Sequence, residues 1–303
     1  MTAETITPDS QHKSLAERLP QPFRDYALLG RFDRPIGWWL LFWPCVWGVW
    51  LTGAGFQWAL LAWLLLGAIA MRAAGCVYND IVDADLDKKV ERTALRPIAS
   101  GRVSKRSAWV WLVSLCLVGL VVLLQLAWQA QLVALGSLAM VAAYPFMKRI
   151  TWWPQAWLGL VFNWGALVGW MALRDDNLAV MFALYAGAVF WTIGYDTIYA
   201  LQDREDDALV GIKSSALRLG GRVKSGVGLF YALALGLWAL AFWLLRSDAI
   251  ALLALMPMAL HLIWQVVTLE TSGPDNPLDR FRSNRMAGAL MAAACFVVGN
   301  AGL

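Results

Sequence analysis

Charged residues are scarce in this chain. Lys, Arg, Asp and Glu make up 15% of its 303 residues, whereas hydrophobic residues make up 60%. Soluble domains carry about 25% charged residues, so this composition argues against an ordinary soluble protein. No basic stripe or binding motif indicates contact with nucleic acid.

Histidine and cysteine are also rare. His12 and His261 are the only histidines, which argues against a haem or a multi-histidine metal centre. The four cysteines lie in apolar stretches and form no CxxC pair, so neither a zinc site nor a disulfide framework is expected. Buried free thiols are the expected state of these side chains.

Long apolar runs dominate the sequence instead. Because a helix needs about 20 apolar residues to cross a bilayer, the runs indicate an all-α, polytopic membrane protein. Residues 1–30 form a polar lead-in without the pattern of a cleavable signal peptide, and residues 31–303 form the membrane domain. Nine spans are expected, near residues 36–54, 57–78, 107–127, 130–147, 156–173, 178–200, 225–245, 248–269 and 285–302.

The positive charges alternate along this topology. Of the 25 Lys and Arg residues, 22 lie before the first expected span or in every second loop after it. The opposite loops contain only Arg174 and Arg246. Loops rich in Lys and Arg stay in the cytoplasm. We therefore expect a multi-pass protein of the inner, cytoplasmic membrane, with its N-terminus on the cytoplasmic side.

Two acidic clusters each follow a long span. The first is N-D-I-V-D-A-D-L-D at residues 79–87, and the second is D-R-E-D-D at residues 203–207. Continued as a helix, Asn79, Asp83 and Asp87 share one face. The four aspartates within residues 79–87 carry like charges that repel one another. A hard divalent cation relieves that repulsion, and carboxylate oxygens suit Mg²⁺. By the charge pattern, both clusters lie in the cytoplasm.

The two clusters indicate an internal repeat. Asp83 and Asp87 recur as Asp203 and Asp207, each 120 residues later. Four spans separate the two pairs, which suggests two four-helix halves around a central cavity, with a ninth helix added. The alternative is a coincidence between two acidic loops.

Other polar residues at or within the spans are candidates for chemistry. An intramembrane carboxylate is a functional candidate by default, and arginines grip diphosphate oxygens in bidentate fashion. A structural explanation is also open: Y-P-F-M-K-R at residues 144–149 could be a positive flank with an interfacial tyrosine, and Arg72 could extend to the interface. The candidates are Arg34, Arg72, Arg96, Tyr144, Lys148, Arg149, Asn163, Asp196 and Lys213.

Taken together, these motifs resemble the UbiA superfamily of intramembrane aromatic prenyltransferases. The chain has the family's N-D-x-x-D-x-x-x-D at residues 79–87, its D-x-x-x-D at residues 203–207 and its Y-x-x-x-K at residues 144–148. The similarity runs from about Arg31 to the C-terminus. The sequences R-P-I-A-S-G, Y-P-F-M-K-R and G-I-K-S-S-A are similar to those of the branch of the family that prenylates 4-hydroxybenzoate for ubiquinone synthesis.

The resemblance implies a reaction and a set of roles. Polyprenyl diphosphate would donate its prenyl group to 4-hydroxybenzoate, with diphosphate as leaving group, and the isoprenoid tail would lie between helices open to membrane lipid. Mg²⁺ would be the cofactor, one ion on Asn79, Asp83 and Asp87 and a second on Asp203 and Asp207. Around the metals, Tyr144, Lys148, Lys213 and Arg96 would bind substrate, Arg149 would hold the benzoate with Arg72 and Arg34 as rivals, and Asp196 or a cluster aspartate would take the ring proton.

Two alternatives remain open on the sequence alone. Other members of the superfamily prenylate different aromatic acceptors on the same scaffold. A membrane transporter also has repeats and intramembrane charges, although its charges lie near the bilayer midplane. Here the carboxylates crowd one edge of the spans instead.

Overall fold

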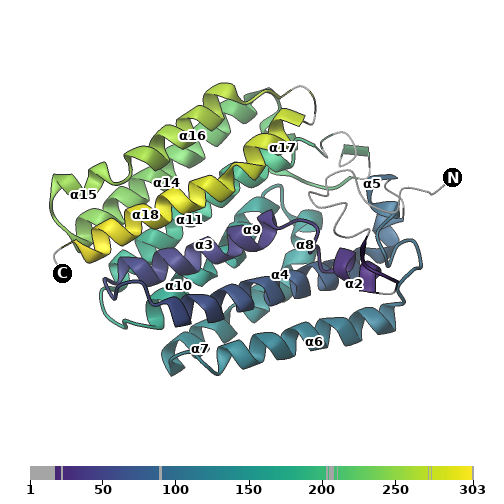
Figure 1. The fold of residues 1–303 in the computed structure, drawn as a ribbon. Helices are drawn as coiled ribbons and strands as arrows, with labels where there is room; N and C mark the ends of the chain where they lie inside the picture. The colour runs from purple at the N-terminus through teal and green to yellow at the C-terminus, as the bar shows by residue number, and fades with distance from the viewer. Residues whose placement is uncertain are drawn as a thin grey trace. The chain divides into compact units, whose positions relative to one another are not determined.

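The structure is a computed structural model that describes residues 18–21, 23–88, 91–202, 204, 208–209, 211–271, 273 and 275–301. Within these ranges every regular element is a helix, which confirms the all-α prediction (Figure 1). The helices are α2 (Phe23–Leu29), α3 (Ile36–Leu51), α4 (Trp58–Asp87), α5 (Glu91–Ala94), α6 (Lys105–Leu123), α7 (Trp128–Gly136), α8 (Leu138–Ile150), α9 (Pro154–Phe162), α10 (Trp164–Met171), α11 (Leu178–Tyr199), α13 (Ser215–Leu219), α14 (Val223–Leu245), α15 (Ala249–Leu253), α16 (Met256–Thr268), α17 (Asp275–Arg282) and α18 (Asn284–Asn300), with a short 3-10 turn at Gly220–Arg222.

Each of the nine expected spans falls on helix, but not all nine meet the requirements for crossing a bilayer. Among the described residues, six helical stretches are long and apolar enough by length and composition, which makes this a multi-pass membrane protein. They are Trp58–Asp87, Lys105–Leu123, Trp128–Ile150, Leu178–Tyr199, Ser215–Leu245 and Ala249–Thr268. The count of nine is therefore not confirmed, because α3 has 16 residues, α18 has 17, and α9 and α10 are separated at Asn163.

The described chain divides into two compact units. The first comprises residues up to Trp38 together with Leu65–Gln125, and the second comprises Trp39–Leu64 together with the residues from Leu126 onward. This division follows neither the expected four-helix halves nor the boundary between 1–30 and 31–303, and both of those stay predictions.

The core of the first unit lies between α4 and α6. Ala73, Val77, Ile81 and Ala84 step along one face of α4 at helical spacing and are buried. They pack in one cluster with Ala108, Leu112 and Leu115 of α6, with Leu29 of α2, and with Ile98 and Val103 from the segment that precedes α6. This packing holds the end of α4, α2 and the 96–103 segment together.

The second unit is packed through aromatic rings and close backbone approaches. Trp47, Trp191 and Trp238 are fully buried, with ring centroids of Trp47 and Trp191 5.1 Å apart. Side by side with them, α3 and α10 approach so closely that a Cβ at Gly169 would collide with the carbonyl oxygen of Cys45. Small residues at such crossings are typical of membrane helices, because lipid supplies no hydrophobic drive for their association.

A buried hydrogen-bond network joins the last helices of the second unit. Gln265 is fully buried; its Oε1 accepts from the Tyr231 hydroxyl at 2.6 Å, and its Nε2 donates to Ser283 Oγ at 3.0 Å and to Asn284 Oδ1 at 3.2 Å. Asn284 Oδ1 also accepts from Trp191 Nε1 at 2.9 Å. The network fixes α14, α16 and α18 around α11.

Candidate functional site

The first acidic cluster is the continuation of a membrane helix. α4 was expected to end at residue 78, but it runs without a break to Asp87, so Asn79, Asp83 and Asp87 do share one helical face. Asp80, Asp83 and Asp87 are only 2%, 1% and 6% exposed. Asp85, in contrast, is exposed and pairs loosely with Lys88 and Lys105. The buried carboxylates require a nearby positive charge.

Two arginines supply that charge. The Arg31 guanidinium donates to both oxygens of Asp80, at 2.9 and 2.8 Å. Arg96 donates to Asp80 Oδ1 at 3.1 Å and to the two oxygens of Asp87 at 3.0 and 2.9 Å. The result is a continuous chain of ion pairs, Arg31–Asp80–Arg96–Asp87, across the end of α4.

Arg31 adopts a strained backbone conformation to make its contacts. Its φ is +58°, in the left-handed region that residues other than glycine seldom occupy. The same guanidinium also donates to the carbonyl oxygen of Leu28 at 2.9 Å. Strain of this kind persists only where surrounding contacts outweigh it, and here the bidentate bond to Asp80 does so.

The segment after the cluster is folded back onto α4. Thr93 Oγ1 donates to the carbonyl oxygen of Asp87 at 2.9 Å, and Arg102 Nε donates to the buried Asp25 of α2 at 2.9 Å. Gly101 has a φ of +79°, which suits glycine and turns the chain towards α6. These contacts place Arg96 beside the aspartates; its predicted role in binding the diphosphate stays a prediction.

The two other arginine candidates of the first unit have local partners. Arg34 Nε donates to the adjacent Asp33 at 3.3 Å. Arg72 lies inside α4, where its Nη1 contacts Cys76 Sγ one turn later, and its guanidinium packs against Gly37. A larger residue at position 37 would displace the Arg72 side chain, so Gly37 makes room for a charge within the span.

In the second unit, the structure brings Lys148 and Lys213 together. The Lys213 backbone N–H donates to the Lys148 carbonyl oxygen at 3.1 Å, and its ammonium donates to the Ile150 carbonyl oxygen at 3.1 Å. α8 ends at Ile150, so these residues gather two positive side chains at its C-terminus. Arg149 is exposed, with its guanidinium 6.0 Å from the centroid of the Phe146 ring.

The second acidic motif follows α11, and most of it cannot be described. Asp203 and Asp207 lie outside the described residues, so their predicted role as metal ligands stays a prediction. Asp196 lies in the last turn of α11, one residue before the buried Thr197, whose hydroxyl is 2.6 Å from Ser215 Oγ. The Ser215 backbone N–H donates to Gln155 Oε1 at 3.1 Å, which links α9, α11 and α13 beside this motif.

Asn163 has a structural role in the second unit. It lies between α9 and α10, fully buried, and its Nδ2 donates to the Gly159 carbonyl oxygen at 2.8 Å and to Thr192 Oγ1 at 2.7 Å. Thr192 in turn donates to the Tyr195 hydroxyl at 3.2 Å. The amide therefore satisfies backbone and side-chain groups at a helix break inside the membrane.

The donor set at the end of α4 fits a hard cation. Asn79, Asp83 and Asp87 offer only oxygen ligands from one helical face, which is the ligand chemistry of Mg²⁺. Within the described part of the chain, no three His, Cys, Asp or Glu side chains already converge as a metal site. A cation held there would add positive charge to a helix end that buries Asp80, Asp83 and Asp87.

A membrane-embedded helical fold with buried carboxylates and arginines at a helix end suits an enzyme acting on anionic lipid substrates. A model of the UbiA prenyltransferase family matches residues 41–294, and the chain belongs to this family. The prediction made from the acidic motifs is therefore confirmed.

Curated relatives are similar over most of their length. The mitochondrial 4-hydroxybenzoate polyprenyltransferase of Drosophila melanogaster is 42% identical over 294 residues, covering 96% of this chain and 75% of the relative. The human protein of the same name is 42% identical over 291 residues, covering 95% of this chain and 78% of the relative.

Solved structures share the fold. The apo structure of a UbiA homolog from Aeropyrum pernix K1 matches with a TM-score of 0.70 and 26% identity, over 86% of this chain and 97% of that one. A UbiA homolog from Archaeoglobus fulgidus bound to GPP and Mg²⁺ matches with a TM-score of 0.66, over 91% of this chain and 99% of that one. At 19% identity, this second likeness shows the fold alone.

Proposed function

We propose that this protein transfers a polyprenyl group from polyprenyl diphosphate to the 3-position of 4-hydroxybenzoate, in ubiquinone biosynthesis and with Mg²⁺. The observation that carries the proposal is the buried chain of aspartates and arginines at the end of α4, in a chain whose curated relatives are named for this reaction. The relatives' names support the acceptor, and the ligand chemistry of the aspartates supports the metal.

The polar residues of the site are assigned to the metal and to the diphosphate. Asn79, Asp83 and Asp87 would hold one Mg²⁺, and Asp203 and Asp207 a second. A metal held there would supply positive charge that stabilises diphosphate as the leaving group. The gathering of Lys148 and Lys213 at the end of α8 supports their assignment to the diphosphate, with Tyr144 beside them in sequence.

Arg96 has a particular place in this proposal. Its guanidinium bonds to both Asp80 and Asp87, so it can leave Asp87 while Asp80 still holds it. Cation binding at Asp87 would compete with Arg96 and free one face of the guanidinium for a diphosphate oxygen. Asp80, both of whose oxygens bond to arginine, positions Arg96 rather than binding metal.

The acceptor side completes the reaction. The ring carbon ortho to the phenol attacks the allylic carbon, and the ring proton passes to Asp196 or to an aspartate of either cluster. We assign the benzoate carboxylate to Arg149 because this residue is exposed at the end of α8 beside Lys148, with Arg72 and Arg34 as alternatives.

The membrane is proposed to be an inner, cytoplasmic one, with the N-terminus and both acidic clusters in the cytoplasm. The distribution of Lys and Arg supports that orientation.

The metal assignment is tested with a matched pair of variants in α4. Asp83→Asn removes a buried carboxylate, and Asp85→Asn removes an exposed one two residues away. Turnover of a prenyl donor and 4-hydroxybenzoate in membrane fractions should fall by about 100-fold or more in the first variant and little in the second, because a preorganised charge at the reacting centre is lost. Near-normal turnover of Asp83→Asn at saturating Mg²⁺ would show the assignment to be wrong.

The same assay separates the alternative functions. Offering dihydroxynaphthoate or homogentisate in place of 4-hydroxybenzoate identifies the acceptor. Mg²⁺-dependent release of diphosphate from the prenyl donor excludes a transporter, because transport leaves the donor intact.

A further inference from the structure

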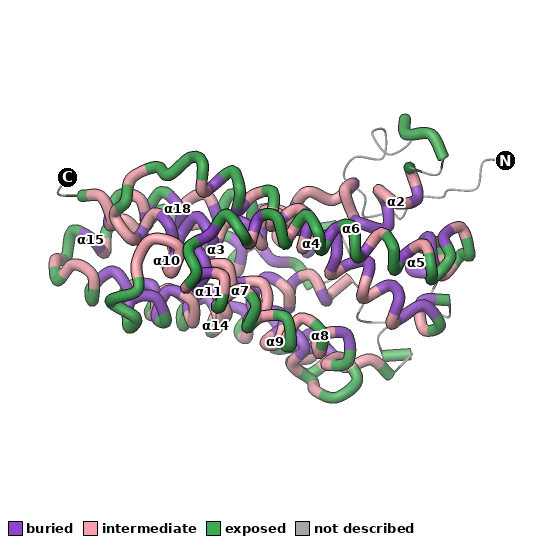
Figure 2. Tube along the Cα trace, turned by 90° about the horizontal axis from the view of Figure 1, so that it is seen from below, coloured by how far each residue is buried: buried purple, intermediate pink, exposed green. Residues whose placement is uncertain are grey.

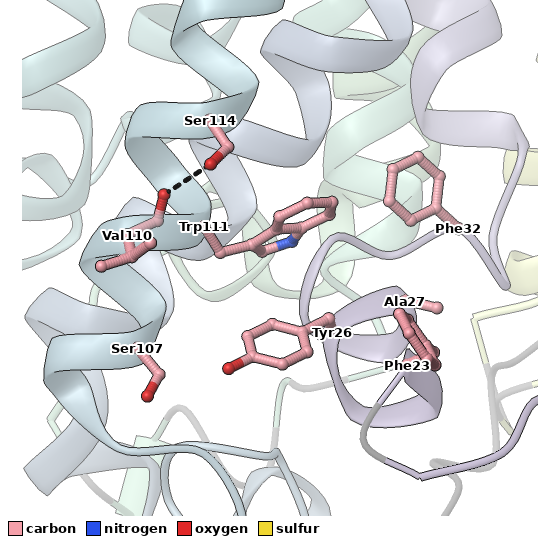
Figure 3. A pocket seen from close by; sticks show the side chains of 8 residues that line it. All are labelled: Phe23, Tyr26, Ala27, Phe32, Ser107, Val110, Trp111 and Ser114. Atoms are coloured by element: carbon pink, nitrogen blue, oxygen red, sulfur yellow. Dashed lines mark hydrogen bonds between the residues drawn. The ribbon is translucent and has the colours of Figure 1, made fainter.

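A cavity of about 450 Å³ lies between α2 and the first half of α6, within the first unit (Figure 3). Figure 3 shows the Trp111 ring of α6 next to the Tyr26 ring of α2, with Phe32 to the right of both. The volume is in the range of small-molecule sites. The lining is formed by Phe23, Tyr26, Ala27, Phe32, Ser107, Val110, Trp111 and Ser114.

Contacts on either side of the cavity fix the positions of its two walls, α2 and α6. Asp25 of α2 is bound by Arg102 at 2.9 Å, and Leu29 of α2 is buried in the same core as Leu112 of α6. The Tyr26 and Trp111 rings meet edge to face, with centroids 5.9 Å apart. Because both helices are fixed, the space does not close by movement of α2 onto α6.

One wall of this cavity belongs to an apolar membrane span. α6 is an apolar membrane span with a mean hydropathy of 2.0, and only 22% of its apolar window is buried (Figure 2). Val110 is 68% exposed and lines the cavity, and the outward face continues along the helix through Val113 and Leu117, which are 53% and 57% exposed. A hydrocarbon chain lying along this face therefore has access to the cavity.

Polar and positive groups lie where α6 begins, next to the cavity. Ser107 lines the cavity, and Lys105 and Arg106 precede it in the first turn of the helix. Arg106 is exposed and has no ion pair in the described chain, whereas Lys105 has only the loose contact with Asp85 at 3.8 Å. These positive charges favour a ligand that carries a phosphate beside its hydrocarbon chain.

We propose that this cavity binds an anionic glycerophospholipid. An acyl chain fills the space between the α2 aromatics and Val110, and the phosphate meets Lys105 and Arg106. The inference does not rest on the proposed function. It has a consequence for the acidic cluster, because Phe32 in the cavity wall directly follows Arg31, which binds Asp80. The bound lipid packs against the turn that holds Arg31 in its strained conformation.

Native mass spectrometry of the purified full chain tests the proposal with palmitoyl-oleoyl phosphatidylglycerol and phosphatidylcholine as probes. Wild-type protein should retain phosphatidylglycerol about tenfold more than phosphatidylcholine. Val110→Trp fills the cavity and should reduce retention of phosphatidylglycerol about tenfold, whereas Val113→Trp, the same change on the same exposed face, should not. Ser114→Phe is a second filling variant if Val110→Trp fails to fold.

The headgroup contact has its own control. Replacing Lys105 and Arg106 by glutamine should abolish the preference for phosphatidylglycerol, whereas the same change at the exposed Arg218 and Arg222 should leave it intact. Equal retention of both lipids by the wild type overturns the anionic assignment. Equal retention of phosphatidylglycerol by Val110→Trp and Val113→Trp overturns the assignment of the lipid to this cavity. Displacement of the lipid by excess geranyl diphosphate assigns the cavity to an isoprenoid chain instead.

Discussion

Replacing Arg31 by alanine should destabilise the protein strongly, because it leaves Asp80 buried with half of its partners removed. Asp80 is 2% exposed, and the Arg31 side chain is 11% exposed, so solvent screens their ion pair little. Removing one partner of a buried pair costs about 3–5 kcal/mol. Arg96 keeps one contact to Asp80 at 3.1 Å, so we expect a loss near the lower limit, about 3 kcal/mol.

That loss corresponds to an increase of about 100-fold in the unfolding equilibrium constant. The positive φ of Arg31 adds a second expectation, since alanine remains strained there and glycine does not. Arg31→Gly should therefore be about 1 kcal/mol more stable than Arg31→Ala. The reverse order would mean that the turn relaxes once the guanidinium is gone.

A double-mutant cycle with Asp80→Asn isolates the ion pair. The double variant should cost about 2 kcal/mol less than the sum of the single variants, because neither charge is then buried alone. Unfolding is followed by tryptophan fluorescence during titration of mild detergent with dodecyl sulfate, with the exposed Arg218→Ala as control. Additivity of the two single changes within about 0.5 kcal/mol would refute the coupling.

Two further variants probe the second unit. Arg149→Ala should raise the KM for 4-hydroxybenzoate about 10- to 100-fold through loss of a charge-assisted hydrogen bond, with the KM for the prenyl donor little changed; the opposite pattern would place Arg149 at the diphosphate. Gln265→Leu should lower stability by about 1–3 kcal/mol, since it removes the acceptor of the buried Tyr231 hydroxyl at 2.6 Å. Thermal unfolding compared with the exposed Gln125→Leu checks this, and equal midpoints would contradict it.

The helices and the first acidic cluster were predictable from sequence because their signals are local. Apolar runs locate the spans, and repeated aspartates mark a place where like charge accumulates. The same local reasoning ended the second span at residue 78, since charged residues normally leave the membrane. In the structure α4 continues, because arginines from elsewhere neutralise the aspartates.

Arg31 was missed as a partner of Asp80 because the two are 49 residues apart and no periodicity connects them. Its positive φ was equally hidden, since only glycine signals that conformation in a sequence. Asp80 was overlooked because helical spacing selected Asn79, Asp83 and Asp87 instead. Both contacts of Lys213 with the end of α8 are accepted by backbone carbonyl oxygens, which the pattern of side chains does not reveal.

The length of α4 ties the position of its aspartates to the thickness of the membrane. Its 30 residues extend about 45 Å, whereas a hydrocarbon core of about 30 Å takes up about 20 of them. With the exposed Trp58 at one interface, the helix emerges at the other near Tyr78, just before the acidic motif. A bilayer thicker by two turns of helix would bring the level of these carboxylates into the hydrocarbon core, so the thickness of the surrounding lipid sets their distance from the membrane surface.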